Sequence, residues 1–178
     1  LYPTFGDHYW EPKWKNPARI IRQKNFRRGF GHHTYDALQM FWRYPPQDLE
    51  KILGDPDIIH ANNFYCPTTL KKARLVYTLH DLAFIEQPEH TLEETRVASF
   101  NGALCASLFA DRIIAVSEYT REHFLRIFPY YPSDKILVVY EGSRFSFKSG
   151  VACPNSLSDY VTSNSFWLNV GTLEPRKN

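Results

Sequence analysis

The sequence contains few of the residues that build disulfide frameworks or metal centres. It has only three cysteines among 178 residues, and no two of them have the C-x-x-C spacing of a zinc or redox site. A sparse and odd set of cysteines is typical of a reducing compartment, so we expect a cytoplasmic protein that holds no metal. The three are Cys66, Cys105 and Cys153.

Long apolar runs and a strong net charge are also missing. No apolar run approaches the roughly 20 residues that cross a bilayer. The net charge is only +2 at pH 7, so the average composition indicates neither nucleic acid nor a membrane as a partner. The charge is nevertheless uneven, because residues 11–28 carry seven cations against one acid.

The basic segment 13–28 has aromatic side chains, Trp14 and Phe26, between its cations. Such a segment can serve RNA, an anionic membrane surface or a phosphorylated acceptor lipid. The simpler alternative is a solvated loop, or a patch folded against the body of the protein. Of the binding roles, we expect peripheral contact with the inner face of the membrane. We expect no nucleic-acid partner.

Short apolar runs followed by polar turns recur along the second part of the chain. Runs without alternation are typical of parallel strands that are covered on both faces. Helix patterns separate several of them, and this alternation predicts an α/β fold with a Rossmann-like, doubly wound parallel sheet. The predicted strands cover residues 57–63, 73–81, 111–118, 135–142 and 165–172.

Four helices are expected between and before these strands. One covers residues 34–43, and the next follows Pro45 and Pro46 and ends before Gly54. A capping box at residues 91–94 predicts a long helix that runs to about Ala110. Its apolar residues recur every three or four positions and are expected to face the sheet; they are Val97, Phe100, Leu104 and Leu108. The last helix is expected to be capped by Ser117 and to bury Phe124, Ile127 and Phe128.

The composition changes after the fourth predicted strand. Residues 143–164 are rich in Ser and Asn and contain Gly and Pro, which is typical of a linker between domains. We therefore expect a first domain over residues 1–148 and a linker over 149–164. Residues 165–178 are then the first strand and turn of a second domain.

Polar side chains follow four of the predicted strands, at Asn62-Asn63, His80-Asp81, Ser117-Glu118 and Glu141-Gly142. Because ligands of open parallel sheets bind beyond the carboxyl ends of the strands, these residues are candidates for one cleft. The His80 and Asp81 pair stands out, since the histidine can donate a hydrogen bond to a substrate hydroxyl. Asp81 can fix the orientation of that ring or cap the following turn. Residues 81–91 are expected to form a loop that shapes one wall of the site.

The chain ends on a second candidate site. Gly171 permits a tight turn after the last strand, and Arg176 and Lys177 supply two cations. If a helix begins after Asn178, its free N–H groups add to the positive field and favour an anion. The alternative is an ordinary solvated basic turn.

Four stretches taken together resemble glycosyltransferase family 4. They are "VYTLHDLAFIEQPE", "ADRIIAVSEYTREHFLRIF", "KILVVYEG" and "FWLNVGTLEPRKN", in that order, and they cover roughly residues 55–178. The resemblance implies a retaining enzyme of GT-B architecture, with two Rossmann-like domains that face each other across a cleft. This chain is similar to the N-terminal part and to the start of the second domain. The family's glycine-rich loop and its two downstream glutamates are absent from the sequence.

The resemblance implies roles for individual residues. His80 matches the histidine close to the transferred sugar, and Lys177 matches the lysine that holds the donor diphosphate, with Arg176 beside it. Many members have arginine directly after the strand glycine, which is Gly171 here, but this sequence has Thr172. Phosphate binding is therefore expected to depend more on the two cations that follow. Polar residues near the strand ends are expected on the acceptor side: Asn62, Arg96, Ser117 and Glu118.

The resemblance also implies a reaction, in which the whole enzyme transfers a sugar from a nucleoside-diphosphate sugar to the hydroxyl of a saccharide or lipid-linked acceptor. The motifs favour the mannosyltransferase side of the family and hence GDP-mannose as the donor, with no further cofactor, in bacterial polysaccharide synthesis. A non-catalytic half-domain that binds an acceptor or a membrane surface is the alternative. A dehydrogenase is disfavoured because no G-x-G-x-x-G follows a strand.

Overall fold

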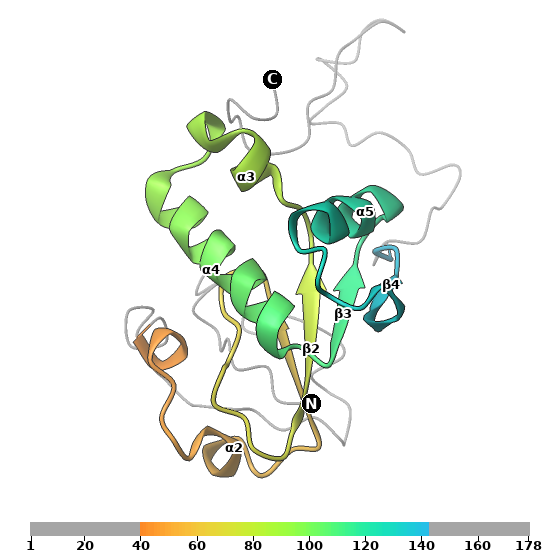
Figure 1. The fold of residues 1–178 in the computed structure, drawn as a ribbon. Coiled ribbons are helices and arrows are strands. Elements are labelled where there is room, and N and C mark those ends of the chain that lie inside the picture. The colour runs from red at the N-terminus through yellow and green to blue at the C-terminus, as the bar shows by residue number, and fades with distance from the viewer. Residues whose placement is uncertain (1–39, 143–178) are drawn as a thin grey trace, which may run out of the picture.

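The computed structural model describes residues 40–142, which form a four-stranded sheet and the helices that join its strands (Figure 1). All neighbouring strands are parallel, and their order in the sheet is their order in the chain. The strands are β1 (Ile58–Asn62), β2 (Arg74–Leu79), β3 (Arg112–Ala115) and β4 (Ile136–Val138). The α/β class and the Rossmann-like parallel sheet predicted from the sequence are therefore confirmed.

One helix precedes the strands, α2 (Leu49–Ile52). The others connect them: α3 (Ala83–Glu86), the 3-10 turn η3 (Pro88–His90), α4 (Glu93–Phe109), α5 (Glu118–Ile127) and the 3-10 turn η4 (Ser133–Lys135). The prediction of a loop over residues 81–91 was wrong in detail, because this segment contains the helix α3 and the 3-10 turn η3. No helix in residues 40–142 is both long and apolar enough to cross a membrane. The basic segment 13–28, the predicted linker 149–164 and the predicted strand 165–172 lie outside the described residues.

The core lies between one face of the sheet and the two long helices. Helix α4 packs on β2, and α5 packs on β3 and β4. Both helices lie on the same face, as right-handed crossovers between successive neighbouring strands require (Figure 1). The side chains of that face are buried and include Ile59, Leu75, Tyr77, Ile113 and Ile136.

The opposite face of the sheet is less covered within residues 40–142. Ile58 on β1 and Leu137 on β4 are exposed there, and Val76 and Ile114 between them are half-buried. Helices α4 and α5 therefore account for one covered face of the sheet.

Helix α4 turns a different side toward the sheet from the one that the sequence predicts. Three residues of the expected stripe, Val97, Phe100 and Leu108, are exposed. The buried positions instead carry small residues: Ser99, Gly102, Ala103, Ala106 and Ser107. A Cβ atom on Gly102 would overlap the carbonyl oxygen of Asn63, which shows how closely the helix backbone approaches the sheet. The prediction failed because this close approach selects small side chains over large apolar ones.

The start of α4 also differs from the prediction. The capping box requires Thr91 as the N-cap residue, but the helix starts after Leu92, whose side chain makes no capping hydrogen bond. Glu93 and Glu94 still occupy the first turn, where carboxylates interact favourably with the positive end of the helix dipole.

Helix α5 agrees with its prediction. The side chain of Ser117 accepts a hydrogen bond from the backbone N–H of Thr120 at 3.1 Å, so Ser117 is the N-cap residue. Phe124 and Phe128 are buried and Ile127 packs against the core, which makes the expected apolar face of this helix. Gly54 likewise follows the end of α2 in a left-handed conformation, with φ 84°.

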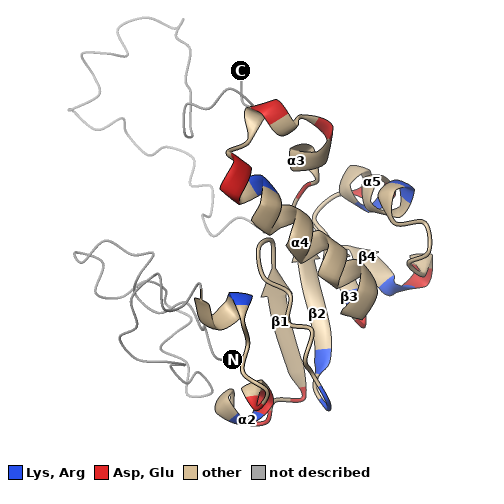
Figure 2. Cartoon of the chain, turned by 60° about the vertical axis from the view of Figure 1, so that its left-hand side comes forward, with Lys and Arg blue, Asp and Glu red and all other residues tan. Residues whose placement is uncertain are grey.

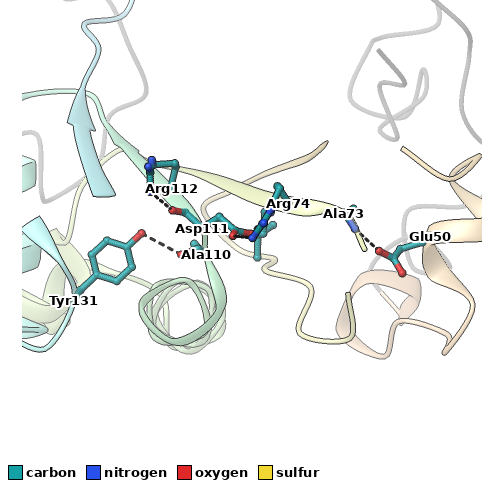
Figure 3. Close-up of polar contacts among 8 residues, drawn as sticks. Glu50, Ala73, Arg74, Ala110, Asp111, Arg112 and Tyr131 are labelled. Carbon is teal, nitrogen blue, oxygen red and sulfur yellow. Dashed lines mark hydrogen bonds and ion pairs between the residues drawn. The ribbon is translucent and has the colours of Figure 1, made fainter. Parts of the chain in front are cut away.

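Carboxylates fasten the sheet at the amino ends of its strands (Figure 3). Glu50 of α2 accepts hydrogen bonds from three successive backbone N–H groups that precede β2, those of Lys71, Lys72 and Ala73. These bonds, with that from Ala73 first, lower the pKa of the Glu50 carboxyl.

Asp111 makes a second attachment at the same edge (Figure 3). Its carboxylate accepts hydrogen bonds from the backbone N–H of Leu75 at 2.9 Å and from the guanidinium of Arg74 at 2.7 Å. The Leu75 bond first, and then Arg74, lower the pKa of Asp111. The hydroxyl of Tyr131 donates to the carbonyl oxygen of Ala110, so the start of β3 is held from both sides.

Candidate functional site

His80 lies directly beyond the carboxyl end of β2, where a ligand of this kind of sheet is expected. Its backbone is held by α5, because the buried side chain of Thr120 donates a hydrogen bond to the His80 carbonyl oxygen at 3.0 Å. Its imidazole is 36% exposed. The fold thus fixes the residue and leaves the ring accessible to a substrate.

The His80 ring is paired with Glu141. The Nδ1 atom of His80 lies 3.0 Å from Oε1 of Glu141, which follows β4 and is 66% exposed. This contact joins the ends of β2 and β4 across the end of β3. The backbone helps to form it, since the N–H of Val139 donates to the carbonyl oxygen of Ala115 and extends the pairing of β4 with β3 beyond the last strand residue.

Asp81 has the capping role and not the orienting one. Its Oδ1 atom accepts a hydrogen bond from the backbone N–H of Ala83 at 3.1 Å, which fixes the turn that opens α3. Of the two roles that the sequence left open for Asp81, the structure therefore shows the cap, and the carboxylate beside His80 belongs to Glu141.

Three of the four predicted acceptor-side residues lie at or just beyond the carboxyl ends of the strands. Asn62 is the last residue of β1, the neighbour of β2. The Ser117 side chain is committed to the cap of α5, while Glu118 is the exposed first residue of that helix. Arg96 lies in the first half of α4. The predicted donor-side residues Gly171, Thr172, Arg176 and Lys177 lie outside the described residues.

The surface around α3 and the start of α4 is acidic. Figure 2 shows in red the Asp and Glu positions that gather on α3, η3 and the first turn of α4. Arg96 follows Glu93 by three residues, a spacing at which opposite charges on a helix attract each other. Arg96 is thus a cation among acidic residues.

A cluster that the sequence did not reveal fastens α3 to α5. The carboxylate of Glu86 lies within hydrogen-bonding distance of three side chains of α5, at 3.1 Å from the Tyr119 hydroxyl and at 3.2 Å from both His123 Nε2 and Arg126 Nη2. Burial lowers the pKa of His123, against the opposing effect of Glu86. Because α3 follows His80 and Asp81 directly, this cluster positions the wall of the site.

The two hollows described for residues 40–142 lie away from the exposed ring of His80. A hollow of about 980 Å³ lies beside α4 and is lined by Trp42, Phe64 and Val97, among others. A smaller hollow of about 330 Å³ lies at the amino end of β2. Neither is lined by His80 or Asp81. No group of three or more His, Cys, Asp or Glu residues in 40–142 is arranged to hold a metal ion.

The comparison with known families agrees with the first three of the four sequence stretches and with this fold, while the fourth stretch, at residues 166–178, lies outside the matched residues. The sequence model of Glycosyltransferase Family 4 matches residues 7–143, which is most of the chain. The chain belongs to Glycosyltransferase Family 4. The resemblance inferred from the sequence is therefore confirmed.

A curated relative gives a more specific likeness. O-antigen chain mannosyltransferase B of Escherichia coli is 34% identical over 125 residues, which are 68% of this chain and 32% of that protein. The chain thus spans about a third of the length of the relative it matches. The mannosyltransferase-like character predicted from the motifs is supported by this similarity.

Proposed function

We propose that this chain is the acceptor-side part of a glycosyltransferase, in which the carboxyl edge of the sheet around His80 faces the transferred sugar. The observation that carries the proposal is the position of His80, whose backbone is held by Thr120 and whose ring is accessible and paired with Glu141. Membership of Glycosyltransferase Family 4 supports the same reading of this edge.

The proposed reaction is transfer of a sugar from a nucleoside-diphosphate donor to an acceptor hydroxyl, with retention of the anomeric configuration. The acceptor attacks from the face that the diphosphate leaves, and the departing phosphate oxygen takes the acceptor proton. His80 positions the sugar and is not the nucleophile, so its contribution is one of orientation. Arg176 and Lys177 stabilise the charge that develops on the leaving diphosphate.

We propose mannose as the sugar, GDP-mannose as the donor and a saccharide or lipid-linked acceptor of bacterial polysaccharide synthesis. The similarity to O-antigen chain mannosyltransferase B supports this choice. We propose a second, donor-binding domain opposite the exposed ring of His80. Residues 165–178 begin that domain, and residues 13–28 hold the enzyme against the inner face of the membrane.

The test is transfer by the complete enzyme from radiolabelled GDP-mannose to acceptors in membranes of its source cells, with UDP-glucose as the competing donor. We expect labelled product from GDP-mannose, and NMR of that product should show the same anomeric configuration as the donor. We also expect residues 1–178 alone to transfer no sugar. If neither donor yields product, and the protein only binds anionic vesicles in a salt-sensitive way, the non-catalytic alternative replaces this proposal.

A further inference from the structure

The pairing of His80 with Glu141 defines which nitrogen of the imidazole is left for a substrate. The Nδ1–Oε1 distance of 3.0 Å is that of a hydrogen bond. A carboxylate only accepts hydrogen bonds, so Nδ1 carries the hydrogen in this contact. The other nitrogen, Nε2, is then an acceptor in the neutral ring and a donor only in the imidazolium.

We propose that Glu141 is a positioning residue, which fixes the ring orientation and the Nδ1–H tautomer of His80 so that Nε2 accepts a hydrogen bond from a hydroxyl of the transferred sugar. The inference rests on the proposed function for the identity of the substrate, but the tautomer itself does not depend on it. It also changes the role expected from the sequence, in which His80 donates to the hydroxyl.

Within residues 40–142, the other polar groups near His80 do not bond to its ring, so Glu141 fixes the orientation of the ring. The carboxylate of Asp81, which is closer in sequence, is bonded to the backbone of Ala83. Thr120 holds the carbonyl oxygen of His80 and not its ring. Among the described residues, Glu141 is therefore the carboxylate that contacts the imidazole.

The contact is poorly suited to a purely structural role. Glu141 is 66% exposed, and exposed ion pairs add little to folding stability because water and salt screen them. Glu141 lies beyond the end of β4, where its removal opens no cavity in the core. Its replacement should consequently leave the fold intact and act on the ring of His80.

The first test is NMR of the chain labelled with ¹⁵N-histidine, using two-bond nitrogen–hydrogen correlations that distinguish the two tautomers. His80→Gln assigns the His80 signals by their loss. We expect the wild-type pattern of a ring protonated at Nδ1, and in Glu141→Ala a shift toward the Nε2–H tautomer. Glu122→Ala removes an exposed carboxylate of α5 and serves as the control. An unchanged His80 pattern in Glu141→Ala would overturn the proposal, whatever the fate of the proposed function.

The second test is kinetic and uses the complete enzyme. Loss of orientation in Glu141→Ala should lower kcat on the order of tenfold to a hundredfold with little change in KM for the donor. Glu141→Gln keeps an acceptor oxygen and should retain most of the activity. Because Glu141 acts through His80, the double variant with His80→Ala should be no slower than His80→Ala alone. Fully additive losses would contradict the proposal, while absence of all transfer would contradict the proposed function and leave the NMR result standing.

Discussion

The Nε2 atom of His123, which is only 4% exposed, lies 3.2 Å from the carboxylate of Glu86. This pair connects α5 to α3, the short helix that follows the candidate site, and it places a titratable ring in the interior of the domain. Tyr119 and Arg126 bond to the same carboxylate, so the position of α3 depends on a polar cluster and not on apolar packing alone.

The first prediction is that His123 makes stability depend on pH. Burial holds the pKa of folded His123 below the value of about 6.5 that it has in the unfolded chain. Below that pH the unfolded state binds the proton more readily, so stability is lost as the pH falls through this range. Urea denaturation at a series of pH values should show a smaller decline between about pH 7 and pH 5 for His123→Gln than for the wild type. His90→Gln, on the surface, is the control, and equal slopes for wild type and His123→Gln would contradict the prediction.

A second prediction concerns Gly102. Glycine to alanine in a helix interior ordinarily stabilises a protein by up to about 1 kcal/mol. Here the added methyl group would overlap the carbonyl oxygen of Asn63 and crowd the Tyr77 hydroxyl, so we expect Gly102→Ala to destabilise by about 1–3 kcal/mol. Chemical denaturation measures the difference, with Asn101→Ala on the exposed side of α4 as the matched control. A more stable Gly102→Ala protein would show that α4 does not lie so close to β1.

A third prediction concerns Asp111 at the amino end of the sheet. Asp111→Asn replaces one acceptor oxygen by a donor and removes the charge that faces Arg74, so we expect a loss of about 1–3 kcal/mol of unfolding free energy. Because its pKa is lowered in the folded protein, Asp111 stabilises at neutral pH, and that stability disappears as the pH falls below about 4. In thermal melts, the unfolding midpoint of the variant should therefore fall less than that of the wild type as the pH is lowered below about 4. Asp134→Asn, exposed on η4, should behave like the wild type.

Most of the described elements, though not α3 and η3, were predictable from the sequence because their signals are local. Ser117 caps α5 by a bond to a residue three positions later, and Gly54 ends α2 through its own backbone conformation. The four described strands were likewise visible as short apolar runs. The face of α4 was not predictable, because the closeness of Gly102 to Asn63 depends on how two distant segments pack.

The candidate site was likewise predictable only in part. The position of His80 after β2 follows from the chain, but its pairing with Glu141 depends on the order of three strands in the sheet. The Glu86 cluster was missed although Tyr119, His123 and Arg126 recur at intervals of four and three residues on one side of α5. This spacing indicates a polar face of α5 that contacts another segment of the chain. Only the fold shows that this segment is α3.

The most direct test of the account compares two histidines that are almost equally exposed, His80 at 36% and His90 at 37%. In the complete enzyme, the rate of mannose transfer from GDP-mannose should fall roughly a hundredfold or more in His80→Ala, with an unchanged midpoint of thermal unfolding. His90→Ala should transfer at the wild-type rate. Wild-type transfer by His80→Ala would contradict the account, because it would remove His80 from the site on which the proposed function rests.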